Sequence, residues 1–151
     1  MTLNDRIRER VDSAKEILNK MHMPANPTVI FDIDDTLINS FGATIKPILE
    51  LYNYVKMLCI TPVIITNRMN EQMVVEYTMY ELESHGINGY HEIYFRDPDE
   101  TDLVRAKLLS RKKVTEKGFD IVMSIGDQKC DIGAFGGVGI ILPSIHSDGQ
   151  S

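Results

Sequence analysis

The residues TVIFDIDDT, at positions 28–36, are the most informative stretch of this sequence. They begin as an apolar, β-branched run with no polar face, which is typical of a central strand in a parallel sheet. A strand over 28–34 sends residues i and i+2 to the same side, so Asp32 and Asp34 are predicted to converge on one site. A single Asp at a strand end is more often a turn residue, but three Asp followed by Thr36 favour a site. Carboxylates so close together repel each other unless a hard divalent cation or a shared proton lies between them.

Helical and strand patterns alternate on both sides of this stretch. Upstream, residues 3–21 carry apolar side chains at helical spacing, and Thr2 with Asp5 resembles a capping box. Downstream, the pattern predicts helices at 44–58, 71–85 and 101–117 and strands at 62–66, 91–95, 121–125 and 138–142. Strands that alternate with helices predict an α/β fold, a three-layer sandwich around a five-stranded parallel sheet. Such sheets bind ligands beyond the carboxyl ends of their strands.

The composition is that of one ordinary globular domain, with 151 residues, 43% hydrophobic and 25% charged. A single domain over residues 1–151 is expected, with residues 1–24 as an N-terminal helical arm. The formal net charge of -6 argues against broad, non-specific binding to nucleic acid, and no apolar run approaches the roughly 20 residues that span a bilayer. Two cysteines are too few for a disulfide framework, and the N-terminus lacks the apolar core of a signal peptide, so a cytoplasmic location is expected.

Two more acids follow the fourth predicted strand. Asp127 comes directly after Gly126, which allows a tight turn, and Asp131 lies four residues further on. An Asp-capped turn is the alternative interpretation. Because the carboxyl ends of parallel strands share one edge, these acids are expected beside Asp32 and Asp34, and that coincidence favours a site.

Cationic and hydroxyl groups are candidates for binding an anion at the same edge. Thr66, Asn67 and Arg68 follow the second strand and could offer a hydroxyl, backbone N–H groups and a cation, although Thr66 alone would equally well be a helix cap. Lys107 lies in a basic helix, so a solvated charged face is its default interpretation. The other basic residues of that helix are Arg105, Arg111, Lys112, Lys113 and Lys117.

These signals, in this order, resemble the haloacid dehalogenase-like (HAD) superfamily of phosphohydrolases, whose hallmark is Asp-x-Asp-x-Thr after the first strand of a Rossmann-like sheet. In that family a Thr or Ser ends the second strand, as Thr66 does here, and an acidic pair of the form Gly-Asp-x-x-x-Asp follows the fourth, as Asp127 and Asp131 do. The segments FDIDDTL, ITNR and KGFDIVMSIGDQKCD look most like the class B acid phosphatases, and their register places Lys107 in the site.

The resemblance implies a Mg²⁺-dependent phosphatase that works through an aspartyl-phosphate. Asp32 would be the nucleophile and Asp34 the general acid and base. Mg²⁺ would be held by the carboxylates of Asp32 and Asp127 and by the backbone carbonyl of Asp34. Asp131 would lie in the outer coordination sphere of the metal or orient Lys107.

The remaining candidates would bind the substrate, a phosphorylated small molecule or macromolecule. Thr66 and Lys107 would hold the phosphoryl oxygens, with Asn67 and Arg68 beside them. The class B enzymes are usually secreted and longer, and this chain is too short for their extra segments. The stretches between the motifs are also too short for a cap domain. Capless family members have open sites that take large substrates or are completed by a neighbouring subunit, so a homo-oligomer is one of the expectations.

Two other functions are compatible with parts of the pattern. A phosphorylation-controlled receiver-like module also combines a parallel sheet with clustered Asp, Thr and Lys, but receivers carry their phosphorylated Asp at the third strand, and HEIYFRD, residues 91–97, has no Asp within its apolar run. A catalytically idle HAD-like scaffold would be free to lose Asp32 or Asp34, and both are present. The pattern therefore favours hydrolysis without naming the substrate.

Overall fold

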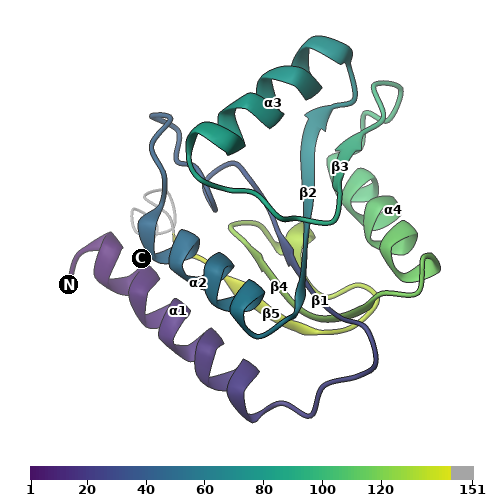
Figure 1. Ribbon diagram of the computed structural model, residues 1–151. Helices are drawn as coiled ribbons and strands as arrows, with labels where there is room; N and C mark the ends of the chain where they lie inside the picture. Colours follow the sequence, from purple (N-terminus) through teal and green to yellow (C-terminus); the bar gives the residue numbers. More distant parts are fainter. Residues whose placement is uncertain (144–151) are drawn as a thin grey trace.

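The computed structural model describes residues 1–143; residues 144–151, the end of the predicted domain, lie outside the described residues. Four helices and five strands follow one another in the predicted alternation (Figure 1). They are α1 (Leu3–Lys20), β1 (Pro27–Phe31), α2 (Lys46–Met57), β2 (Thr61–Met69), α3 (Gln72–Ser84), β3 (Ile93–Arg96), α4 (Leu103–Glu116), β4 (Asp120–Gly126), the 3₁₀ helix η1 (Lys129–Asp131) and β5 (Val138–Ile141). The predicted α/β fold is confirmed.

The five strands form one parallel sheet in the order β3-β2-β1-β4-β5. β1 lies at its centre, where Ile30 pairs with Val63 of β2 on one side and with Ser124 of β4 on the other. Helices α1 and α2 cover one face of the sheet and α4 covers the other, which makes three layers (Figure 1). The carboxyl ends of β1, β2 and β4 therefore meet at one edge.

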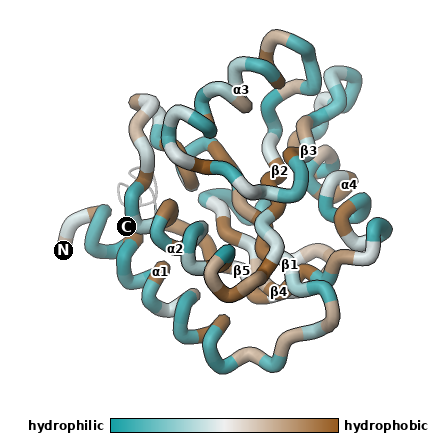
Figure 2. The backbone as a smooth tube through the Cα atoms, viewed as in Figure 1, coloured by the Kyte–Doolittle hydropathy of each residue, from teal (hydrophilic) through white to brown (hydrophobic). Residues whose placement is uncertain are grey.

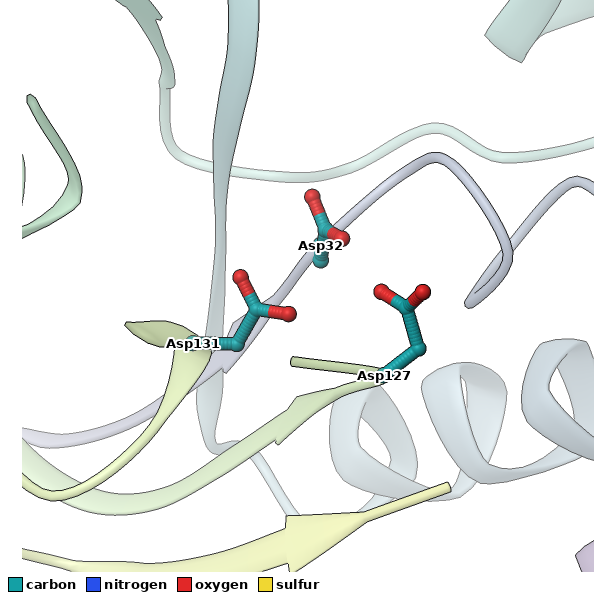
Figure 3. Close-up of side chains that lie close together, drawn as sticks. All are labelled: Asp32, Asp127 and Asp131. Atoms are coloured by element: carbon teal, nitrogen blue, oxygen red, sulfur yellow. The ribbon is translucent and has the colours of Figure 1, made fainter. Parts of the chain in front are cut away.

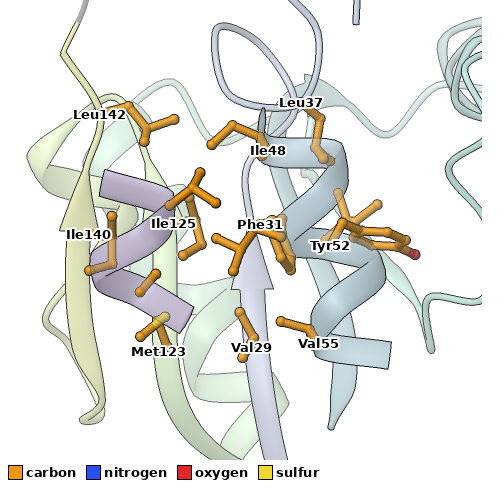
Figure 4. Packing of buried hydrophobic residues seen from close by; sticks show 14 of the residues in the cluster. Val29, Phe31, Leu37, Ile48, Tyr52, Val55, Met123, Ile125, Ile140 and Leu142 are labelled. Atoms are coloured by element: carbon orange, nitrogen blue, oxygen red, sulfur yellow. The ribbon is translucent and has the colours of Figure 1, made fainter. Parts of the chain in front are cut away.

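The larger core fills the space between the sheet and helices α1 and α2. Val29 and Phe31 of β1 point into it, and the Phe31 ring lies edge-on to Tyr52 of α2 at 5.2 Å between centroids (Figure 4). α1 adds a buried stripe at helical spacing, formed by Ile7, Val11, Ala14 and Leu18. The predicted capping box of Thr2 and Asp5 begins this helix.

A smaller core lies on the opposite face, beneath α4. Ile30 of β1 joins Val63, Ile65, Tyr94, Val114 and Ile121 there. Successive residues of a strand face opposite sides, so Val29 and Phe31 serve the larger core and Ile30 serves the smaller one. Figure 2 shows the hydrophobic segments gathered in the strands at the centre of the molecule.

The first strand is shorter than predicted, since β1 ends at Phe31 and not at residue 34. Asp35 adopts a left-handed conformation, with φ of 58°, and the amides of Leu37 and Ile38 both donate to the carbonyl of Ile33. These bonds close a tight turn immediately after Asp32. The same-side rule of an extended strand therefore does not govern Asp34.

The second strand is longer than predicted and continues to Met69, so Asn67 and Arg68 lie within it. The apolar spacing of the following helix predicts Val75, Met79 and Leu82 on its buried face. α3 instead buries Thr78 and Leu82, and Met79 is 49% exposed. Figure 1 shows the reason: α3 lies beside the end of β2 from which it follows, and it reaches the larger core through Leu82.

No cap domain interrupts the described chain. Between β1 and α2 there is only a small hairpin, in which Ile38 bridges to Asp34 and to Thr44. Within residues 1–143, no helix is both long enough and apolar enough to cross a membrane.

Candidate active site

Asp32 stands at the carboxyl end of the central strand. Its backbone N–H donates to the carbonyl of Ile125 in β4 at 3.1 Å, which continues the sheet by one residue beyond β1. Its side chain is almost entirely buried. The sheet thus fixes the backbone of Asp32 and directs its carboxylate to the edge where β4 also ends.

Three carboxylates meet at this edge. Asp127 follows β4 directly and Asp131 ends η1, and one oxygen from each of Asp32, Asp127 and Asp131 lies within 4.8 Å of the others (Figure 3). Asp131 is held in place by the turn itself, since its Oδ2 accepts a hydrogen bond from the backbone N–H of Gln128 at 3.0 Å.

Gly126 is the residue that permits this approach. A Cβ at position 126 would lie 2.2 Å from the Cβ of Asp131 and 2.4 Å from its Oδ2, closer than any real pair of such atoms. The Asp131 side chain therefore packs directly on the bare Cα of Gly126, which explains the glycine by space and not by backbone angle.

Lys107 supplies the positive charge of the cluster. It lies on the inner face of α4, only 3% exposed, and its ammonium is 2.8 Å from Oδ1 of Asp32 and 2.6 Å from Oδ1 of Asp131. A third contact, a hydrogen bond of 3.1 Å to the carbonyl of Ile65, ties the ammonium to β2. Lys107 is thus buried, and the solvated face that its helix suggests is wrong for this residue.

The charges of the cluster do not balance, because three acids face one ammonium. Burial raises the pKa of Asp32 to about 7; Lys107 lowers it, but Asp131 and Asp127 raise it further. Burial also raises the pKa of Asp127. Burial disfavours the charged form of Lys107, but the attraction of Asp32 and Asp131 outweighs this and raises its pKa. The site therefore favours binding of further positive charge.

A hard divalent cation fits this donor set. Carboxylate oxygens are the ligands that Mg²⁺ prefers, and a cation among Asp32, Asp127 and Asp131 would offset the burial and the repulsion that raise the pKa values of Asp32 and Asp127. The described residues offer no cysteine or histidine as a fourth member of the group within that distance.

Asp34 lies apart from the buried cluster. Its side chain is 60% exposed, and both of its oxygens accept hydrogen bonds from Arg68, at 3.1 Å from Nε and 2.8 Å from Nη2. The sequence pairs Asp34 with Asp32, whereas the structure pairs its carboxylate with a cation from β2.

The polar residues at the end of β2 divide between two sides of the strand. Thr66 is buried, and its hydroxyl accepts a hydrogen bond from the backbone N–H of Arg68 at 3.1 Å. Asn67 points the other way and donates from Nδ2 to the carbonyl of Leu103, the first residue of α4, at 3.3 Å. Because side chains alternate along a strand, Thr66 and Arg68 lie on one side of β2 and Asn67 lies on the other.

Arg111 is a residue of this region that the sequence reading missed. Its side chain is buried, with the residue 1% exposed, and it donates to Ser124 and to the carbonyls of Asp131, Ala134 and Gly136. The expected solvated face is therefore wrong for Arg111 as well as for Lys107. The spacing could have revealed it, because residues four apart lie on the same face of a helix.

A sequence model of the HAD superfamily, subfamily IIIB (acid phosphatase), matches residues 42–144, more than half of the chain. The match includes Thr66, Lys107, Asp127 and Asp131 and begins after Asp32 and Asp34. No curated protein sequence matches the chain.

Similarity to solved structures extends the comparison to the fold. A chain from "Structure of Pnkp1/Rnl/Hen1 complex" is similar with a TM-score of 0.64 at 15% sequence identity, over 80% of this chain and 47% of that chain. The present chain thus spans about half the length of its structural relative. At this identity the similarity concerns the fold alone.

Proposed function

This chain belongs to the HAD superfamily, subfamily IIIB, the acid phosphatases, and from that premise we propose that it is a Mg²⁺-dependent phosphatase that hydrolyses phosphate monoesters through an aspartyl-phosphate on Asp32. The observation that supports the proposal most directly is the position of Asp32. It combines a buried carboxylate at the end of the central strand, a cation at 2.8 Å in Lys107 and two further acids beside it.

The proposed reaction has two steps. The Asp32 carboxylate attacks phosphorus, so that a new P–O bond forms while the bond to the leaving oxygen breaks, and Asp34 protonates that oxygen. Asp34 then takes a proton from water, which attacks phosphorus and releases inorganic phosphate and free Asp32. Asp34 suits both roles because its side chain is exposed to solvent, unlike that of Asp32.

The other residues of the site would hold charge in place. Lys107 would balance the carboxylate of Asp32 and, with Thr66, bind the phosphoryl oxygens. Asp32, Asp127 and the backbone carbonyl of Asp34 would hold Mg²⁺, with Asp131 orienting Lys107. When bound, Mg²⁺ supplies charge that neutralises both the acids and the transferred phosphoryl group.

The substrate in this proposal is a phosphorylated small molecule or macromolecule. The hairpin between β1 and α2 leaves the carboxylate edge without a cap, which favours an open site that takes large substrates or is completed by a second copy. A cytoplasmic enzyme without broad nucleic-acid binding completes the proposal.

The strand order argues against a receiver-like module. Flavodoxin-like domains, whose order receivers share, are arranged 2-1-3-4-5, whereas this sheet has the Rossmann order β3-β2-β1-β4-β5. The repulsion among the buried carboxylates argues against an idle scaffold. A protein that did not use the cluster would gain stability by losing one of these acids.

The experiment that tests the proposal traps the intermediate. Purified protein is mixed with ³²P-labelled aryl phosphate and Mg²⁺, quenched in acid, digested and analysed by mass spectrometry. Label is expected on the peptide that contains Asp32, and excess EDTA should abolish turnover until Mg²⁺ is restored.

The matched control is Asp32→Asn, which keeps the side-chain shape and should lose both label and turnover. Undiminished turnover in EDTA would overturn the metal requirement, and label on another residue would overturn the assignment of Asp32.

A further inference from the structure

Arg68 is bound by protein groups on two sides. Toward the site, its Nε and Nη2 donate to the two oxygens of Asp34 at 3.1 and 2.8 Å. Toward α3, its Nη1 donates to the hydroxyl of Thr78 at 3.1 Å and to Oε1 of Glu81 at 2.8 Å. Four of the five guanidinium N–H groups are therefore used within the chain.

The two sides of this arrangement differ in burial. Arg68 and Glu81 are 16% and 13% exposed at their side chains, and Thr78 is fully buried, so the half that faces α3 is largely shielded from water. Asp34 is the exposed member. A planar guanidinium that binds both carboxylate oxygens fixes the orientation of the carboxylate as well as its distance.

We infer that Arg68 is a positioning residue for Asp34, and that α3 acts on the reaction through the chain Glu81, Arg68, Asp34. The inference rests on the proposed role of Asp34 as general acid and base. Each oxygen of Asp34 keeps a second lone pair, so it can exchange a proton with the leaving group or with water while Arg68 holds it.

This role differs from the substrate-binding role that the sequence suggests for Arg68. Only one N–H of Arg68, on Nη2, is left for a phosphoryl oxygen, because the other four donate to Asp34, Thr78 and Glu81. An arginine that gripped the substrate would affect every phosphate ester alike. An arginine that orients the general acid matters most where the leaving group needs a proton.

The test compares an alkyl phosphate, a poor leaving group, with an aryl phosphate, a good one, at saturating Mg²⁺. Arg68→Met should lower kcat for the alkyl phosphate by about 10-fold to 100-fold, within the range of general acid catalysis, and should lower kcat for the aryl phosphate much less. KM should change by less than about twofold for either, since no substrate contact is removed. Arg68→Lys should not restore activity, because an ammonium cannot bind both oxygens of a carboxylate in parallel.

A double-mutant cycle identifies the partner of Arg68. Adding Arg68→Met to Asp34→Asn should slow the alkyl phosphate no further than Asp34→Asn does alone, because the two residues act as one unit. Arg8→Met is the matched control: it breaks a 3.0 Å Arg–Glu pair between α1 and α2, and should leave both rates unchanged. If Arg68→Met fails to fold, Glu81→Leu keeps the guanidinium and should show the same alkyl-specific loss.

Three outcomes overturn the inference. Equal loss on both substrates with a raised KM would make Arg68 a substrate-binding residue, and unchanged rates would make it structural only. Full additivity with Asp34→Asn would separate the two residues. In each case Asp34→Asn alone would still discriminate between alkyl and aryl phosphates; if it does not, the proposed role of Asp34 fails, and the inference fails with it.

Discussion

Asp32 lies in surroundings that disfavour its own charge. Burial and two neighbouring acids raise its pKa to about 7, although the ammonium of Lys107 is 2.8 Å away. A carboxyl group must be ionised to attack phosphorus. The metal-free site therefore disfavours the ionised form of Asp32 that the proposed reaction needs. Strongly shifted pKa values of this kind cluster at functional sites.

This conflict predicts how the stability of the metal-free protein depends on pH. The folded pKa of Asp32, about 7, lies above its ordinary value of 3.8, so folding favours the protonated acid. Its contribution to stability is complete below about pH 4 and is lost as the pH rises through 7. In EDTA, raising the pH from about 4 to above 7 should therefore lower the melting temperature of the wild type more than that of Asp32→Asn.

Thermal unfolding at steps from pH 4 to 8 measures the difference. The relative fall should vanish with saturating Mg²⁺, because the cation then replaces the proton as the partner of Asp32. Parallel curves for wild type and variant in EDTA would contradict the prediction.

Among the elements, the turn from β4 into η1 depends on Gly126. In Gly126→Ala the new Cβ would lie 2.2 Å from the Cβ of Asp131, so the Asp131 side chain must move. We expect a loss of about 1–3 kcal/mol in the free energy of unfolding from overpacking. We also expect Mg²⁺ affinity to fall about 10-fold to 100-fold, as when a supporting residue of a metal site is lost.

Denaturant unfolding and isothermal titration calorimetry measure the two effects. The control is the double variant Gly126→Ala/Asp131→Gly, which removes the clashing Cβ and should be less destabilised by the alanine than the wild type is. Equal destabilisation in both backgrounds would show that Asp131 is not the group displaced.

The loop after η1 depends on α4 through Arg111. Arg111→Met removes the donors to the carbonyls of Asp131, Ala134 and Gly136. The bond to Asp131 is buried and the other two are partly buried, and a buried carbonyl left unpaired costs about 1–3 kcal/mol. We expect a loss of about 2–4 kcal/mol in the free energy of unfolding and weaker Mg²⁺ binding. The exposed Arg105 is the control, since Arg105→Met should change stability by no more than about 0.5 kcal/mol. An unchanged melting temperature for Arg111→Met would refute the prediction.

α4 also shows why part of the site could not be read from the sequence. Its buried face is mostly polar, formed by Ala106, Lys107, Ser110, Arg111 and Val114. Apolar periodicity marks the wrong side of such a helix, because Val104 and Leu108 are among its exposed residues. Family register alone predicted Lys107 at the site, and the prediction was not extended along the same helix face to Arg111, four residues further on.

For β1 and β2, the sequence predicts the strands well but their ends poorly. Their apolar runs predicted buried parallel strands, which the structure confirms, because the apolar residues of these runs face one or the other of the two cores. The ends of the strands were predicted less well. The turn at Asp35 depends on hydrogen bonds to the carbonyl of Ile33, and the end of β2 depends on the pairing of Met69 with Arg96 of β3. Apolar periodicity reports neither of these.

For the whole molecule, the position of the site follows from packing on both faces of one strand. Phe31 presses into the larger core and Ile30 into the smaller one, and Asp32 is the next residue. The backbone before the proposed nucleophile therefore has little freedom. Rigid strands of this kind hold a reacting group more precisely than a loop could.

The N-terminal helix belongs to this packing, which leads to the last prediction. Leu18 of α1 is 2% exposed within the larger core, so Leu18→Ala should lower the free energy of unfolding by about 2–5 kcal/mol. Denaturant unfolding should remain one cooperative transition, because α1 and the sheet share that core. Met73→Ala, at an exposed position on α3, is the control and should change stability by no more than about 0.5 kcal/mol. A wild-type midpoint for Leu18→Ala, or two separate transitions, would mean that residues 1–24 are an arm that folds independently of the domain.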